Sequence, residues 1–525
     1  MDHVELIVFG LLVATSALAV LAGVLRVPYP ITLVLGGAMI GFLPGIPSVE
    51  LDPDIVLLIF LPPLLYGTAI FTSVRELRRN VKAIAALAIP LVFVTMAAVA
   101  VVAHAVVGLG WAESFVLGAI VSPTDAVAPA EIMRRVGAPR RLVAIIEGEN
   151  LTNDWTALIL YRLAVAAVVS GSFTLWKGGL EFVASGIGGV AVGLAAGWLI
   201  RQVRARIDDP PTEVTISILS GYVGYLPAEE LGLSGVIAAV TTGLYMAWYT
   251  PQLTTPILRL QTRAVWEILT FLLNAVLFLL VGLQLPGILD DLSGTSTADL
   301  LLWGGLVSAV VIGVRLAWVF TLPYVSRLID RRDTQRGRRI AADERLVVGW
   351  AGMRGSVSLA AALAIPLHTD GGGAFPEREL IIFLAFAVIL VTLIGQGLTL
   401  GPLINRLGIE DDGQESQEDT LARRRAAEAA LARLDELGEP DWISPESVGR
   451  ARQMFDYRER RFGALEDGAE ENFEDRADAW RRLMYDLFDA QRQELLELRN
   501  RGEISDDIRR NVERDLDLEE TRIQS

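Results

Sequence analysis

The 525-residue sequence contains no cysteine and only three histidines. The lack of cysteine excludes a disulfide framework, thiolate chemistry and cysteine-ligated zinc or iron–sulfur sites. The histidines (His3, His104 and His368) are too widely separated to indicate a histidine metal site or a proton wire. The sequence therefore predicts no resident cofactor.

Charge is also scarce over most of the chain. Residues 410–525 hold 33 Asp and Glu against 19 Arg, which accounts for 14 of the 16 net negative charges. The first 409 residues are nearly neutral, in a chain that is 52% hydrophobic with a mean hydropathy of +0.44. This pattern excludes a soluble globular enzyme and a nucleic-acid-binding protein. It predicts an all-α polytopic membrane domain over 1–409 and an acidic, helical cytosolic domain over 410–525.

The first 409 residues contain thirteen apolar runs, most of them near the length of about 20 residues that a membrane-crossing helix needs. The runs lie near residues 4–25, 29–46, 53–72, 83–108, 112–133, 142–169, 179–200, 212–227, 232–249, 265–285, 299–325, 346–367 and 379–404. Alternate loops carry 21 Lys and Arg, whereas the intervening loops carry only Lys177 and Arg378. Because cytoplasmic loops are enriched in basic residues, we expect a plasma-membrane protein with its N-terminus outside and its tail in the cytoplasm.

Thirteen spans permit two inverted repeats of six helices, spans 1–6 and 8–13, joined by span 7. The fifth span of each repeat is interrupted: 112–133 by prolines at 123 and 129, and 346–367 by three glycines between 349 and 355. Interrupted helices at corresponding positions of inverted repeats indicate the binding site of a transporter. For the glycines alone, close helix packing is an alternative explanation.

Acidic residues at bilayer depth are costly and therefore indicate function. Asp154 lies roughly 20 Å along its span, near the bilayer midplane. Partial burial disfavours the charged form of a carboxylate, so Asp154 can hold either a proton or a monovalent cation, and this competition couples the two fluxes. Asp125, Thr124 and Asn150 offer further oxygen ligands for the cation, although Asp125 has the alternative role of capping a half-helix.

A second buried acid, Glu149, needs a positive partner. Arg315 and Arg354 lie at similar depths in their spans, so depth alone does not decide which of them forms the ion pair. A structural role for Glu149 is favoured over direct ion binding.

Three motifs now resemble a known family: Ser122-Pro-Thr-Asp-Ala-Val, Glu147-Gly-Glu-Asn-Leu-Thr-Asn-Asp154 and Gly352-Met-Arg-Gly-Ser-Val-Ser358. They are similar to motifs of the sodium/proton exchanger type of monovalent cation:proton antiporters, over residues 1–409. The resemblance implies a homodimer, an elevator-like movement of a core against a scaffold, and crossing of the fifth and twelfth helices.

The same resemblance implies roles for the residues of these motifs. Asp154 is implied to be the ion- and proton-binding carboxylate, next to Asn153. Thr124 and Asp125 are implied to lie in the unwound segment of the fifth span. Glu149 and Arg315 are implied to form the core ion pair, with Arg354 as the arginine of the second crossing helix.

Two departures from the family pattern bear on selectivity and on the helix break. Ala126 replaces a usual proline, so the unwinding is expected to depend on Pro123 and Pro129. Asn150 stands where serine is common, which leaves the choice among Na⁺, Li⁺ and K⁺ open. The Asn153–Asp154 pair marks the electroneutral branch, and a single titrating carboxylate agrees with one-for-one exchange.

Two other classes of function stay open at this point. A cation channel would need a filter or an acidic pore ring, and no such motif is evident. An intramembrane enzyme could use Asp125 and Asp154 as paired carboxylates. In the tail, Trp480–Leu498 predicts an amphipathic helix for a partner helix or the dimer mate, or a merely solvated helix.

Overall fold

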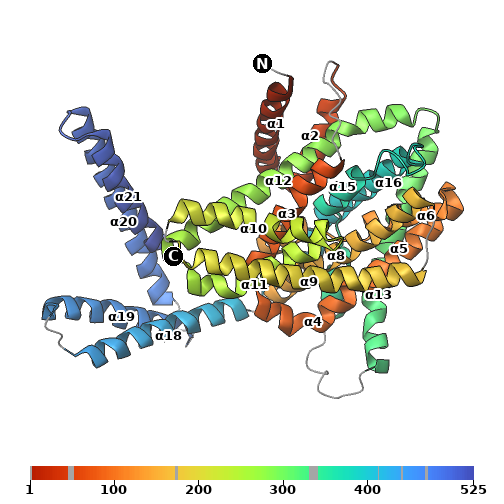
Figure 1. The fold of residues 1–525 in the computed structure, drawn as a ribbon. Helices are drawn as coiled ribbons and strands as arrows, with labels where there is room; N and C mark the ends of the chain where they lie inside the picture. The colour runs from red at the N-terminus through yellow and green to blue at the C-terminus, as the bar shows by residue number, and fades with distance from the viewer. Residues whose placement is uncertain are drawn as a thin grey trace. The chain divides into compact units, whose positions relative to one another are not determined.

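The computed structural model describes residues 3–25, 27–44, 53–171, 175–207, 209–329, 341–411, 413–438, 442–466 and 471–524. In these residues the regular secondary structure is helical and no extended strand forms (Figure 1). The chain divides into two compact units, Met1–Asp411 and Asp412–Ser525. Each unit is described by itself below.

Every one of the thirteen predicted apolar runs coincides with a helix or a broken helix of the first unit. The first four runs correspond to α1 (His3–Leu25), α2 (Tyr29–Gly41), α3 (Pro53–Phe71), and α4 (Val74–Ala88) continued by α5 (Pro90–Val102) and the π-helix η1 (Ala103–Val107). The next five correspond to α6 (Trp111–Val121) with α7 (Val127–Arg135), α8 (Arg140–Ser170), α9 (Leu175–Arg204), α10 (Pro210–Glu230) and α11 (Gly235–Leu253). The last four correspond to α12 (Pro256–Asp291), α13 (Thr297–Ile329), α14 (Ala342–Trp350) with α15 (Ser356–Leu363), and α16 (Arg378–Val391) with η3 (Thr392–Gln396) and α17 (Gly397–Leu407).

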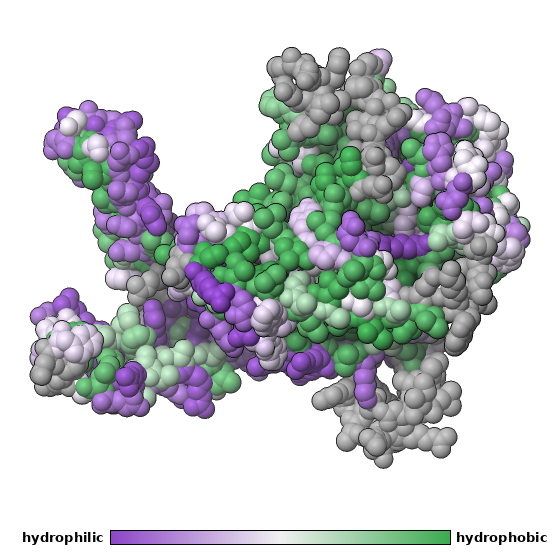
Figure 2. Space-filling model, viewed as in Figure 1, coloured by the Kyte–Doolittle hydropathy of each residue, from purple (hydrophilic) through white to green (hydrophobic). Residues whose placement is uncertain are grey.

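Length and apolar composition single out five helical segments of the described chain as able to cross a membrane on their own. They are Val74–Val107, Gly178–Arg204, Pro256–Asp291, Thr297–Leu322 and Arg378–Leu407. Figure 2 shows hydrophobic residues over much of the face of the first unit that is in view. Large apolar side chains, such as Ile187 and Trp198 of α9, are more than half exposed, as expected of a surface that faces lipid rather than water.

Two predicted helix breaks are present. The first falls between Val121 and Val127, at Pro123, and the second between Trp350 and Ser356. Pro129 has a different effect from the expected one: it lies in the first turn of α7, where a missing backbone N–H removes no helical hydrogen bond. The break in the fifth run therefore depends on Pro123, and Pro129 helps to start the following half-helix.

Close packing elsewhere in this unit uses glycines. α2 and α12 lie against each other, and a Cβ atom added at Gly37 or Gly282 would come within 2.4 Å of a backbone oxygen of the facing helix. Small residues at a helix–helix contact let the two backbones approach more closely than larger side chains would allow. The pairing fixes α12, which lines the site described next.

The second unit consists of helical hairpins. α18 (Gln414–Leu437) packs against α19 (Pro445–Glu466), and α20 (Glu471–Asn500) packs against α21 (Asp506–Gln524). In the second hairpin Phe488 and Leu516 are buried, whereas Trp480, Leu483 and Leu487 on α20 are about half exposed. The amphipathic helix expected from the sequence is present, and its exposed stripe has no cover within the described hairpin.

Candidate functional site: two crossing broken helices

The two broken helices meet at Asp125. Its backbone N–H donates to the carbonyl of Met353 (2.8 Å) in the second break. Its carboxylate accepts from the N–H of Val127 (2.8 Å) and from the N–H of Ser356 (3.2 Å), the first residues of α7 and α15. One negative side chain thus caps the N-termini of two half-helices, where the helix dipole favours negative charge. The alternative role of Asp125 as a cap describes its observed contacts.

Two arginines lie at the opposite helix ends. Arg354 donates from Nε to the carbonyl of Val121 (3.0 Å), the last residue of α6, and from Nη1 to the carbonyl of Gly352. Arg315 donates from Nη2 to the carbonyl of Val348 (3.0 Å) in the last turn of α14. The unsatisfied carbonyls of a helix C-terminus attract positive charge. At each break, a negative charge therefore lies at the N-terminus of the second half-helix and a positive charge at the C-terminus of the first.

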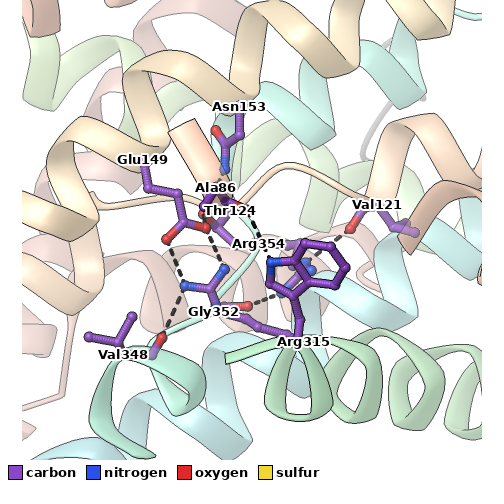
Figure 3. A network of polar contacts seen from close by, with 10 residues as sticks. Ala86, Val121, Thr124, Glu149, Asn153, Arg315, Val348, Gly352 and Arg354 are labelled. Atoms are coloured by element: carbon purple, nitrogen blue, oxygen red, sulfur yellow. Dashed lines mark hydrogen bonds and ion pairs between the residues drawn. The ribbon is translucent and has the colours of Figure 1, made fainter. Parts of the chain in front are cut away.

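A hydrogen-bonded chain runs from Arg315 to Asn153 (Figure 3). Nη1 and Nη2 of Arg315 both donate to the Glu149 carboxylate, Nη2 at 2.9 Å from Oε2. Thr124 donates to Glu149 Oε1 (3.2 Å) and accepts from the Asn153 amide (2.8 Å). Arg315 and Glu149 are each 1% exposed, so the pair is bidentate and fully buried. The arginine that pairs with Glu149 is Arg315, while Arg354 binds backbone carbonyls.

A cavity of about 40 Å³ lies beside this crossing. Since one water needs about 10–15 Å³ on this measure, the cavity has room for a cation with a few waters. Its polar lining comes from α3, α8, α12 and both breaks. The lining polar residues are Thr68, Thr124, Asp125, Asn150, Asp154, Thr270, Asn274, Ser356 and Ser358.

Asp154 is an acidic side chain of this lining without a polar partner among the described residues. It is 3% exposed, and in the part of the chain that the structure describes its carboxylate makes no hydrogen bond or ion pair. Because burying an unpaired charge is costly, this carboxylate favours either a bound proton or a bound cation.

The structure brings together most of the residues that the sequence predicted, with different contacts. Asp154, Asn150, Asp125 and Thr124 line the cavity, but the last two already hold backbone or side-chain partners. Asn153, Glu149, Arg315 and Arg354 form the network behind it. The sequence analysis missed Thr392, which lies in the π-helix η3. Its hydroxyl accepts from the backbone N–H of Arg354 (3.1 Å). It also missed Thr68 and Thr270, because single threonines in apolar helices belong to no sequence motif that would indicate a site.

Replacement of Gly355 by alanine is expected to disrupt the crossing. A Cβ atom at this position would lie 1.5 Å from Asp125 Oδ2, so Asp125 would have to leave both backbone N–H groups that it caps. Overpacking costs about 1–3 kcal/mol and loss of a helix cap about 0.5–2 kcal/mol. Thermal unfolding in detergent should show a clearly lowered Tm. Gly401→Ala is the control, because its nearest neighbours lie at ordinary contact distances of 3.6 and 3.7 Å; equal Tm values for the two variants would contradict the prediction.

An apolar, all-helical unit in which two broken helices meet beside a polar cavity is typical of a secondary transporter. Comparisons with known proteins agree. The sequence model of the transmembrane sodium/hydrogen exchanger family matches residues 10–406. The chain therefore belongs to the sodium/hydrogen exchanger family.

Relatives support this assignment, and a solved structure has a similar fold. An uncharacterized Na⁺/H⁺ exchanger of Mycobacterium tuberculosis is 37% identical over 98% of this chain and 97% of its own length. A sodium, potassium, lithium and rubidium/H⁺ antiporter of Bacillus subtilis is 30% identical over 78% of this chain and 62% of its own length. The sodium proton antiporter MjNhaP1 of Methanocaldococcus jannaschii has a similar fold, with a TM-score of 0.61 and 21% identity over 77% of this chain and 99% of its own.

Proposed function

We propose that the protein exchanges protons for monovalent cations through Asp154, across the plasma membrane. The observation that carries the proposal is the buried Asp154 carboxylate, which lines a polar cavity and has no partner among the described residues. A proton and a hard cation compete for this carboxylate, so the binding of one releases the other. Asn150 lines the same cavity and offers an oxygen ligand, whereas Thr124 and Asp125 are already engaged.

The exchange is electroneutral in this proposal. Glu149 is neutralised by Arg315, and Asp125 caps two half-helices, so Asp154 alone is left to change its proton occupancy. An aspartate at position 153 would add a second charge beside Asp154. The residue there is Asn153, whose neutral amide donates to Thr124. One carboxylate then carries one proton in one direction and one monovalent cation, Na⁺, Li⁺ or K⁺, in the other.

The proposed topology follows the sequence argument. Thirteen membrane spans form two inverted six-helix repeats, with the N-terminus outside and residues 410–525 in the cytoplasm. Each predicted run coincides with a helix, and α6–α7 and α14–α15 are the two broken ones. The crossing forms the core that carries Asp154 between the two sides.

A homodimer is part of the same proposal, and α20 is a candidate dimer contact. Its exposed stripe of Trp480, Leu483 and Leu487 can pair antiparallel with the same stripe of a second copy. That arrangement brings the exposed Arg482 of one copy near the acidic Asp486 of the other, so the two surfaces are complementary in charge.

Disulfide crosslinking tests the dimer contact. Because the chain has no cysteine of its own, any disulfide must come from the introduced residue. Leu483→Cys in the full-length protein should give a disulfide-linked dimer under mild oxidation. Arg510→Cys, on the polar side of α21 where Arg510 pairs with Asp507, should remain monomeric on a denaturing gel. Equal crosslinking of both variants, or none of Leu483→Cys, would count against this contact.

The test of the main proposal is exchange in liposomes. Purified protein is reconstituted with a pH-sensitive dye inside and an imposed pH gradient, and Na⁺, Li⁺ or K⁺ is then added. Cation-dependent, saturable proton movement is expected, at the same rate at two imposed membrane potentials. Proton movement that follows voltage would contradict electroneutrality, and cation flux without proton movement would favour a channel.

A further inference from the structure

Asn274 of α12 is a polar residue at the cavity that the proposed exchange does not yet use. Its side chain is 1% exposed, and it lines the same cavity as Asp154. Its amide oxygen is buried and has no hydrogen-bond partner among the residues that the structure describes. Buried polar atoms are almost always paired, so an unpaired amide oxygen beside a cation cavity calls for a partner that is absent from the protein itself.

Thr270 supports the same interpretation. It lies four residues before Asn274, on the same face of α12, and also lines the cavity. α12 is fixed by its close packing against α2, and Asp154 and Asn150 come from α8. Among the elements that line the cavity, α8 carries the titrating carboxylate and α12 contributes two further oxygen-bearing side chains.

We propose that Asn274, assisted by Thr270, supplies the α12 half of the monovalent-cation site and selects among Na⁺, Li⁺ and K⁺. This inference depends on the proposed exchange at Asp154. Alkali cations take hard oxygen ligands, and such ligands replace water from the hydration shell. The terminal torsion of asparagine is soft, so the amide can present its oxygen to the cation directly or through one water.

Selectivity follows from the geometry. A ligand on α12 sets how far the cation can lie from the Asp154 carboxylate, because the two helices are held by different neighbours. A smaller cation can lie close to Asp154 on α8, whereas a larger cation can contact the ligands on α8 and on α12 at the same time. Removal of the α12 ligand should therefore change the order of cation preference as well as the affinity, and should leave the protonation of Asp154 in place.

The test compares four full-length proteins in the liposome assay: wild type, Asn274→Leu, Thr270→Val and Thr262→Val. Asn274→Leu is expected to raise the apparent KM for Na⁺ about tenfold, the scale of one lost contact to a charged group. Its maximal rate should stay within about twofold of wild type, and the ranking of Na⁺, Li⁺ and K⁺ should change. Thr270→Val should act in the same direction with a smaller effect.

Thr262→Val is the matched control. Thr262 is also on α12 and its hydroxyl is also buried and unpartnered, but it does not line the cavity. Its KM and cation order should equal those of wild type. If Asn274→Leu does not fold, Asn274→Ala and Thr270→Val carry the test with the same expectation.

Two results would overturn the inference while the proposed function stands. The first is an unchanged KM and cation order in folded Asn274 variants with an active wild type, and the second is a loss of maximal rate alone. A wild-type protein that moves no protons with any cation would instead overturn the exchange itself.

Discussion

Asp154→Asn is expected to reduce cation-dependent proton movement to the level of protein-free liposomes. Asparagine has nearly the same shape, so the packing of α8 should survive. It cannot bind or release a proton at neutral pH, and its amide is a weaker cation ligand than a carboxylate. Because the proposed coupling is competition at this one group, loss of its titration removes coupling entirely rather than shifting it to another pH.

Glu267→Gln provides the control for this variant. Glu267 is also a carboxylate in the first unit, but its side chain is 66% exposed and paired with Arg263. Its exchange activity should match wild type. Exchange that persists in a correctly folded Asp154→Asn protein would move the coupling site elsewhere, with Asp125 as the next carboxylate in the cavity lining.

Much of this site was predictable because membrane burial makes polar residues conspicuous. A carboxylate within an apolar run costs too much to be incidental, and this argument pointed to Asp154 and Glu149. The break at Pro123 was predictable because proline removes a backbone donor. The positions of the apolar runs were predictable because each needs a minimum length of apolar residues.

The remaining details depend on rotation about helix axes, which the sequence does not specify. Depth placed Arg315 and Arg354 at one level and left the choice open, whereas the family resemblance implied Arg315. In the structure, Arg315 is the arginine that contacts Glu149. The sequence left Asp125 as either a cation ligand or a helix cap, and only the structure shows that both of its oxygens accept from backbone N–H groups. Asn274 and Thr270 sit in α12, and their approach to the cavity depends on packing of that helix against α2.

Glu149→Gln is expected to destabilise the folded protein by about 3–5 kcal/mol, the cost of removing one partner from a buried ion pair. Arg315 would keep its charge at 1% exposure with no carboxylate to neutralise it. Thr124 would also lose the charged acceptor of its hydroxyl, which weakens the link to Asn153. The measurement is thermal unfolding of the purified protein in detergent, and the expected result is a strongly lowered Tm.

The double variant Glu149→Gln with Arg315→Met should recover most of that loss, because no buried charge is then unpaired. The control is Arg263→Gln with Glu267→Gln, an exposed i, i+4 pair on α12 whose removal should cost no more than about 0.5 kcal/mol. If the double variant is stable and still exchanges cations for protons, Glu149 has a structural role, as its contacts suggest. If it is stable but inactive, Glu149 takes part in transport beyond holding Arg315, and the assignment of titration to Asp154 alone would be wrong.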